Sequence, residues 1–280
     1  MLEKKGADSL PAIEDTSAWG NIKNFLGCKP WLIGFILTNV QWFIYFIAVS
    51  LAPLSVIAPL LGFGLVVLTI FSHFYLHEKI MRVELMGIGV IIVGIVLIGV
   101  TALPETNKYS IEEMFSLFGA PGALIYLLGI TLVAIILCGY SISKEYKFAP
   151  AIVFGFASGV GAGIGGTFTK GISAGFDNIL AAAGNGLWWI MLLLMLAGNV
   201  ISMVLLQVGF QKGKAVIVGP IFSVLGMILP VFSGVIIFNE WASQTSSNIM
   251  LQIIGLIVIT VGIIILSFYG EKKRTQSEQS

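Results

Sequence analysis

Four amide side chains are the polar groups of this sequence best placed to bind a solute in apolar surroundings. Asn39 and Gln41 lie in one long apolar stretch, and Asn199 and Gln207 lie in another. An amide without a partner in lipid is costly, so such side chains face neighbouring helices or a polar pathway. Asn39 and Asn199 lie in corresponding stretches, which favours a shared central cavity. Simple hydrogen bonding between helices is the alternative.

Hydroxyls and carboxylates extend this set only slightly. Ser158 and Thr167 are two further pathway candidates, although hydroxyls in helices more often bond to the local backbone. None of the fourteen Asp and Glu residues lies inside an expected membrane span. A hard divalent cation prefers oxygen ligands that include carboxylates, so such an ion would have to pass hydrated between carbonyl and amide groups. The same distribution argues against a proton relay of buried carboxylates.

Two patterns that could indicate a metal or a cofactor have simpler explanations. His73 and His77 stand four residues apart beside Glu78, as metal ligands can, but Met81 takes the place of the second histidine of a His-Glu-x-x-His motif. Residues 161–166 formally fit a dinucleotide fingerprint, which needs a preceding strand, whereas glycines in an apolar helix allow close packing. No nucleophile with a nearby base is recognisable. We expect no catalytic residue, no metal site, no cofactor and no enzyme activity.

Prolines and a lysine mark the ends of apolar stretches. Pro59 and Pro220 occupy equivalent places, where a proline frees a backbone carbonyl. Paired breaks of this kind in inverted repeats mark binding regions, and a proline tolerated in a first helical turn is the equal alternative. Pro230 should kink its helix. Lys170 either attracts anions or, as we favour, extends its charged end to water.

The elements that position these residues are membrane helices. The chain is 57% hydrophobic and 10% charged, whereas soluble domains are about 25% charged. Between two of the apolar stretches, Ser110 and Glu113 form a capping box, which predicts a short amphipathic helix resting on the outer membrane surface. Eight stretches of roughly 20 residues are long enough to span a bilayer: 31–51, 54–76, 85–103, 121–142, 149–169, 187–207, 216–238 and 249–268. The predicted fold class is all-α, a polytopic bundle of eight transmembrane helices.

The basic residues predict the orientation. A transmembrane domain (31–268) is flanked by an N-terminal segment (1–30) and a tail (269–280), and of fifteen Lys and Arg only Lys108 and Lys170 fall on one face. Because basic residues are retained on the cytoplasmic side, both termini should be cytoplasmic in a multi-pass protein of the cell membrane. We expect lipid and a small solute or divalent cation as partners, and no nucleic acid. Whether the chain forms a homodimer stays open.

One helical pattern occurs twice, in residues 31–103 and 187–268. The copies are linked by helices 121–142 and 149–169, and five crossings separate equivalent helices. An odd number of crossings inverts the second copy relative to the first, which is typical of secondary transporters. The matching features are residues 55–59 with 216–220, the glutamates Glu78 and Glu240, and the seven-residue spacing of Gly87 and Gly94 with that of Gly255 and Gly262.

The repeat also predicts a helix before the first copy. Helix 149–169 precedes the second copy, ends in Thr169-Lys170-Gly171 and has no counterpart, while the chain opens with Glu3-Lys4-Lys5-Gly6. We expect that a first helix is missing, through either start-site assignment or real loss.

Several segments resemble the drug/metabolite transporter superfamily (EamA-like), and within it the NIPA-type magnesium transporters. The resemblance covers nearly the whole chain, and Glu78, Lys170 and Glu240 are boundary residues of its motifs. It implies an all-helical permease that works by alternating access, with nine helices in that branch and Mg²⁺ as the first candidate substrate. The matching segments are 51–53 running into 58–60, 75–79, 168–171, 218–221 and 237–241.

Two alternatives stay open. This chain has Trp42 and Gln211 where the magnesium branch tends to carry acidic residues. The alternative within transport is an organic metabolite or drug permease, for which Tyr45, Phe46 and Tyr126 are further aromatic candidates for a pocket. The alternative from another class is a membrane scaffold or binding subunit that does not transport.

Overall fold

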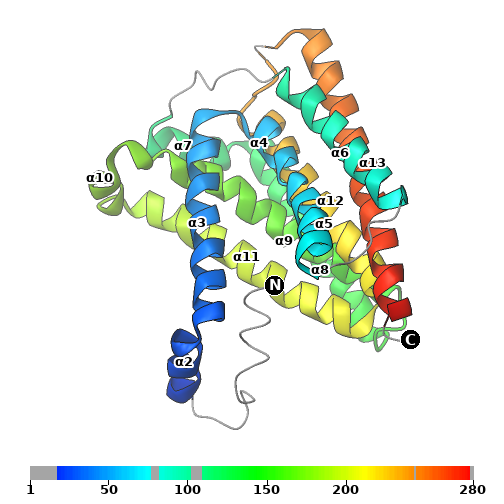
Figure 1. Ribbon diagram of the computed structural model, residues 1–280. Helices are drawn as coiled ribbons and strands as arrows, with labels where there is room; N and C mark the ends of the chain where they lie inside the picture. Colours follow the sequence, from blue (N-terminus) through cyan, green and yellow to red (C-terminus); the bar gives the residue numbers. More distant parts are fainter. Residues whose placement is uncertain (1–17, 77–81, 102–108, 243, 278–280) are drawn as a thin grey trace. The chain divides into compact units, whose positions relative to one another are not determined.

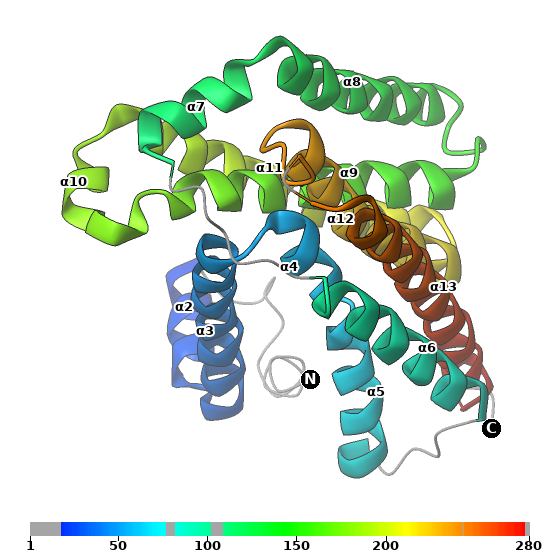
Figure 2. The same ribbon diagram turned by 90° about the horizontal axis from the view of Figure 1, so that it is seen from above.

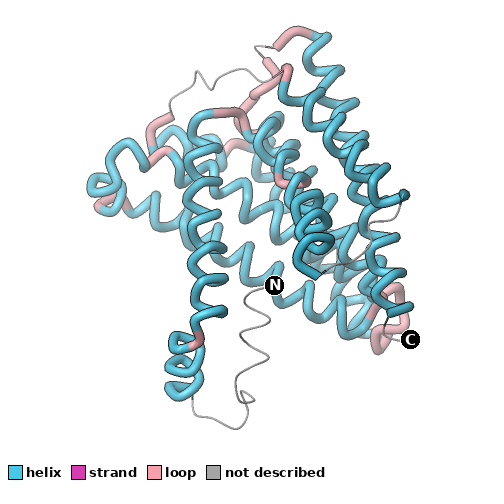
Figure 3. Tube along the Cα trace, in the orientation of Figure 1, coloured by secondary structure: helices cyan, strands magenta, loops and turns pink. Residues whose placement is uncertain are grey.

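The computed structural model describes residues 18–76, 82–101, 109–242 and 244–277. Every regular element within these ranges is a helix, and they contain no strand (Figure 3). The chain forms two compact units, Met1–Ala48 and Val49–Ser280. The predicted all-α class is confirmed for the part of the chain that the structure describes.

The first unit contains α2 (Ala18–Gly27) and most of α3 (Lys29–Leu51). Pro30 lies in the first turn of α3, where the N–H that proline lacks would have no acceptor in the helix. α3 covers the first predicted span, and its 23 residues are long enough to cross a hydrocarbon core of about 30 Å.

The second predicted span is two helices in the structure. α4 (Leu54–Leu60) ends one residue after Pro59, and α5 (Phe63–Leu76) begins after two intervening residues. At the junction, the N–H groups of Leu61 and Gly62 donate to carbonyl groups three residues earlier. This is the tighter bonding of a 3₁₀ turn, so α4 is a short helix separate from α5.

The other predicted spans are present as helices. The remaining elements are α6 (Arg82–Gly99), α7 (Ile111–Gly119), α8 (Pro121–Ser143), α9 (Pro150–Ser173), η2 (Phe176–Asn178), α10 (Ile179–Ala183), α11 (Gly186–Lys212), α12 (Ala215–Ile236) and α13 (Ser246–Ser277). Among the described residues, six helices are long and apolar enough to cross a membrane: Arg82–Gly99, Pro121–Ser143, Pro150–Ala183, Gly186–Lys212, Ile217–Ile236 and Ser246–Leu266. They confirm a helical membrane protein that crosses the bilayer several times.

α9 packs against α8, α11 and α12 within the second unit (Figures 1 and 2). Its glycines contact two of these neighbours. A Cβ added to Gly159 would lie 2.6 Å from Leu225 Cβ in α12, and a Cβ added to Gly161 would lie 2.9 Å from the Gly198 carbonyl oxygen in α11. Small residues let helices approach this closely. The packing role predicted for this glycine-rich stretch is confirmed.

α6 and α13 run side by side and cross along glycine faces (Figure 1). A Cβ added to Gly94 would lie 2.8 Å from the Gly255 carbonyl oxygen, and one added to Gly262 would lie 3.1 Å from the Gly87 carbonyl oxygen. The two helices are therefore antiparallel at the crossing. Isoleucines fill the rest of the contact and are almost fully buried: Ile91, Ile98, Ile259 and Ile263.

The capping box at the start of α7 is confirmed. The Glu113 N–H donates to the Ser110 hydroxyl at 3.2 Å, and the Ser110 N–H donates to the Glu113 carboxylate at 2.8 Å. Met114 and Phe118 of α7 are buried, and the Phe118 ring stacks on Phe168 of α9 with centroids 4.5 Å apart. Part of the apolar side of α7 thus packs on protein.

Candidate functional site

Two charged side chains hold the backbone that links α3 to α4. Glu240, in the turn after α12, accepts hydrogen bonds from the N–H of Leu54 at 2.7 Å and the N–H of Ser55 at 2.8 Å, one on each carboxylate oxygen. Lys170, near the end of α9, donates from Nζ to the Ala52 carbonyl oxygen at 3.2 Å. We call these three hydrogen bonds the backbone clamp.

The clamp supplies partners that this backbone lacks. The first N–H groups of a helix have no acceptor within it, and Pro53, at the N-cap of α4, makes no side-chain capping bond. The Glu240 carboxylate provides two acceptors instead, and its negative charge suits the positive end of a helix. The Lys170 ammonium binds the opposite kind of group, a carbonyl oxygen.

Both charged groups of the clamp are withdrawn from water. Lys170 is 2% exposed and Glu240 is 9% exposed. Burial raises the pKa of the Glu240 carboxyl above its ordinary value, while the N–H donors of Ser55 and Leu54 and the positive charge of Lys170 act in the opposite direction. The Ser55 hydroxyl also lies close enough to favour the carboxylate, although it does not reach the geometry of a hydrogen bond.

Gly234 of α12 makes room for the Glu240 carboxylate. A Cβ at this position would collide with Glu240 Oε2 and would lie 3.1 Å from the Ser55 nitrogen. No glycine in the described ranges has a positive φ, so the need for glycine here comes from space and not from backbone conformation. A larger residue would push the carboxylate away from the start of α4.

Sequence reasoning finds the charged residues of the clamp but misses their partners. Lys170 and Glu240 stand out as boundary residues of family motifs. The prediction that Lys170 extends to water is wrong, because its side chain is buried and donates to Ala52. The clamp joins positions 118 and 186 residues apart. The one local signal is a charged residue at the end of an apolar stretch.

Thr167 belongs to a second polar group, between α8, α9 and α12. Its Oγ1 lies 2.8 Å from the Gly163 carbonyl oxygen and 2.7 Å from Ser233 Oγ of α12. Ser233 and Tyr126 both donate to the Leu229 carbonyl oxygen, at 3.0 Å and 2.9 Å. These hydroxyls connect the three helices.

Ser158 and Asn199 lie where α9 crosses α11. The carbonyl oxygen of Ser158 accepts a hydrogen bond from Ser202 Oγ at 2.7 Å, and its hydroxyl donates within α9 at 3.0 Å. The Asn199 amide donates within α11 at 2.9 Å and lies over Gly165, where a Cβ would be 2.5 Å from the amide nitrogen. Gln207, further along α11, is exposed.

For the other predicted site residues, the structure gives the element in which they lie but few side-chain contacts. Asn39 and Gln41 lie in α3, and their side chains are not among those that the structure describes. Glu78 lies outside the described residues. Pro59 lies within α4, whereas Pro220 lies within α12, which runs on to Ile236 without a break. Across the described ranges, no group of three or more His, Cys, Asp or Glu side chains could hold a metal ion.

Comparison with known proteins covers nearly the whole chain. Residues 1–272 match the family model for the magnesium transporter NIPA. The chain is 25% identical to probable magnesium transporter NIPA6 of Arabidopsis thaliana, over 100% of this chain and 85% of that protein. It is 27% identical to probable magnesium transporter NIPA9 of the same organism, over 95% and 76%, and 22% identical to magnesium transporter NIPA4 of Mus musculus, over 97% and 67%. No solved structure matches it. The chain belongs to the NIPA magnesium transporter family.

Proposed function

We propose that this chain moves Mg²⁺ across the cell membrane by alternating access between two inverted halves of an eight-helix bundle. Membership of the NIPA family over residues 1–272 supports the substrate. The relatives named above carry magnesium transport in their names, two of them as probable. The mechanism has its support in the helix packing.

The observation that carries the mechanism is the crossing of α6 and α13. Gly87 corresponds to Gly255 in the repeated sequence pattern, and Gly94 corresponds to Gly262. In space, Gly94 meets Gly255 and Gly87 meets Gly262. Gly94 thus lies against the counterpart of Gly87, and Gly87 lies against the counterpart of Gly94. A two-fold axis between inverted repeats would produce this arrangement. Equivalent helices that cross in this way suit a protein whose halves exchange roles.

The pathway lies between these halves and is lined by neutral polar groups. Asn39 and Asn199, in equivalent helices, contribute amides to it, and Gln41, Gln207, Ser158 and Thr167 are further candidates. Pro59 and Pro220 cannot donate a backbone N–H, so the carbonyl groups four residues earlier lose their usual helical donor, and in this proposal they face a hydrated ion. Carbonyl and amide oxygens are ligands that Mg²⁺ accepts while it keeps part of its water shell.

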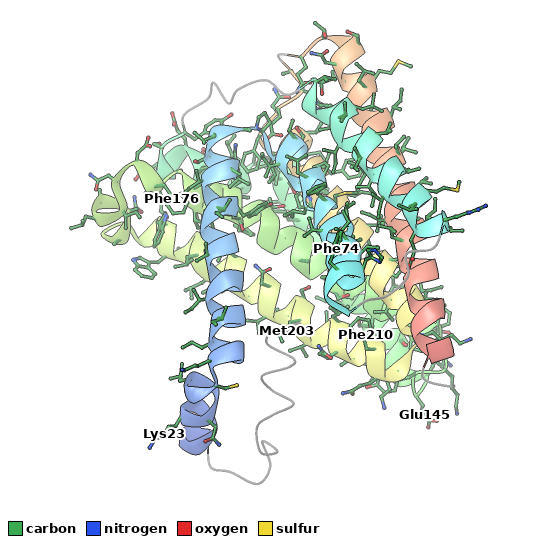
Figure 4. All side chains as sticks on the ribbon, viewed as in Figure 1. Lys23, Phe74, Glu145, Phe176, Met203 and Phe210 are labelled. Atoms are coloured by element: carbon green, nitrogen blue, oxygen red, sulfur yellow. The ribbon has the colours of Figure 1, made fainter. Side chains whose placement is uncertain are left out.

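Both termini face the cytoplasm in this proposal. The asymmetry of Lys and Arg supports that orientation. The end of the protein where α9 finishes then faces outward, and the loop between α8 and α9 faces inward. Figure 4 shows Phe176, which follows α9, far from Glu145, which precedes it.

The experiment that tests this function is uptake into proteoliposomes loaded with a magnesium-sensitive dye. We expect Mg²⁺ entry above that of empty liposomes, and no such entry with the Asn39→Ala, Asn199→Ala double variant. If Mg²⁺ does not enter although the protein is folded and inserted, the substrate proposal fails. Uptake of an organic solute would then indicate a metabolite or drug permease, and no transport at all would indicate a scaffold or binding subunit.

A further inference from the structure

We propose that the backbone clamp closes one end of the transport pathway and must release during each cycle. Lys170 and Glu240 are then positioning residues of transport, which hold α4 in place when that end is closed. This inference rests on the proposed function only in assuming that a pathway for a solute exists. It does not depend on which solute is carried.

The clamp joins parts of the chain that alternating access must move relative to each other. Residues 52–55 belong to the first repeat copy, Glu240 belongs to the second, and Lys170 belongs to α9, between the copies. Contacts between inverted halves have to change when one end opens and the other closes. The clamp is a polar contact of this kind, and it connects three separate elements at one end of the second unit.

The held segment is small enough to move as a unit. α4 has seven residues and is followed by the turn at Leu61 and Gly62 before α5 begins. The clamp acts on the other end of α4. This short helix is therefore held at its start and followed by a turn at its end. Gates in proteins are commonly short segments with hinge residues at element ends.

The chemistry of the clamp also favours a reversible contact. Its bonds are two N–H donors on a carboxylate and one ammonium on a carbonyl group, and water can replace each of these partners when the end opens. A contact that never breaks would be more stable if apolar side chains formed it, because burying charged groups costs desolvation free energy. A lysine and a glutamate that are both nearly inaccessible therefore suit a contact that forms and breaks.

Gly234 allows the clamp to be broken without removing either charge. Alanine at this position would displace the Glu240 carboxylate, because the new Cβ would occupy the place of Oε2. Gly219, in the same helix, has nothing within 4 Å of an added Cβ. Gly219→Ala is thus a matched control for Gly234→Ala.

The test measures how fast a cysteine under the clamp reacts with a water-soluble maleimide. Ser55→Cys suits this purpose because the Ser55 side chain is 2% exposed and its hydroxyl makes no hydrogen bond. Cys28 and Cys138, the two native cysteines, are replaced by serine. Nanodiscs expose both ends of the protein to the reagent, so the orientation in the membrane does not affect the result.

We expect Glu240→Ala to speed labelling of Ser55→Cys by at least roughly tenfold, because two hydrogen bonds to a charged group are lost. Gly234→Ala and Lys170→Met should act in the same direction. Gly219→Ala should not, nor should Glu112→Ala, which removes an exposed carboxylate of α7. If Glu240→Ala does not fold, as judged by gel filtration and helical circular dichroism, the Gly234→Ala and Gly219→Ala pair decides.

A second reporter cysteine separates a gate from general loosening. Ser141 lies in the last turn of α8, is fully buried and donates to the Phe148 carbonyl oxygen, just before the start of α9. This is the end of α9 away from the clamp, so Ser141→Cys should label at an unchanged rate in every clamp variant. Equal labelling of Ser55→Cys with and without the clamp would overturn the inference. So would a rise at both cysteines, since that would mean that the clamp only stabilises the fold.

The outcomes for the clamp and for the substrate can be told apart. If Mg²⁺ uptake fails but the clamp variants change labelling of Ser55→Cys alone, the gate stands and the substrate is wrong. If Mg²⁺ enters and labelling does not respond to the clamp variants, the transporter stands and the gate is wrong.

Discussion

Gly94 of α6 and Gly255 of α13 lie against each other's backbone: a Cβ on Gly94 would be 2.8 Å from the Gly255 carbonyl oxygen, and a Cβ on Gly255 would be 2.9 Å from the Gly94 carbonyl oxygen. An added methyl group therefore has to push the two helices apart. We expect Gly94→Ala to lower the free energy of unfolding by about 1–3 kcal/mol, the usual cost of overpacking.

The control for this prediction is Gly89→Ala, on the same helix, where an added Cβ would meet nothing within 4 Å. The measurement is the unfolding midpoint of each purified variant in detergent. Equal midpoints for Gly94→Ala and Gly89→Ala would show that the glycine crossing is not tight in the folded protein.

The hydroxyl contact between α9 and α12 should contribute little but measurable stability. Thr167 Oγ1 lies 2.7 Å from Ser233 Oγ, and both residues are almost completely buried. Hydrogen bonds between membrane helices are worth about 0.6 kcal/mol on average. A double-mutant cycle of Thr167→Val and Ser233→Ala should give a coupling free energy of about that size. A coupling of zero would mean that each hydroxyl is satisfied by its own helix.

The amides of Asn39 and Asn199 should matter for transport more than for folding. We expect Asn39→Ala combined with Asn199→Ala to abolish Mg²⁺ uptake while the protein still inserts into the membrane. Asn199 donates its hydrogen bond within its own helix, so its loss should leave the Ser202–Ser158 hydrogen bond between α11 and α9 in place. Val200→Ala, at an exposed position beside Asn199 in α11, is a suitable control. Unchanged uptake in the double variant would remove the shared-cavity proposal.

The buried carboxyl of the clamp should make stability depend on pH. Burial raises the pKa of Glu240 in the folded protein above the ordinary value of 4.5. The folded state therefore holds this proton more tightly than the unfolded state, and stability falls as pH rises from the ordinary value through the raised pKa. The measurement is the unfolding temperature between about pH 5 and pH 8, compared with that of Glu240→Gln. Parallel curves for the two proteins would contradict the prediction.

Much of the fold follows from local properties of the sequence. The apolar stretches predict the membrane helices because length and hydropathy are read over one segment at a time. The capping box at Ser110 and Glu113 is likewise local and is present as predicted. The glycines of α9 predict close packing, because a face of small residues has little other use in an apolar helix.

The local sequence predicts less well where one helix ends and the next begins. Pro59 marks a disturbance in the second span, but the chain leaves the helix at Leu61 and Gly62. Pro220, its predicted equivalent, lies in a helix that continues. A proline removes one hydrogen bond in either setting, and the neighbouring helices decide whether the chain bends there.

The apolar stretches and motifs of the sequence predict the membrane helices and the family of this protein. What Lys170 and Glu240 do depends on the tertiary structure. Each is a charged residue at the end of an apolar stretch, and from that position either one could reach water. Instead, both are buried on the backbone of residues 52–55, because the unpaired groups that attract them belong to a segment more than a hundred residues away, which only folding brings within hydrogen-bonding distance.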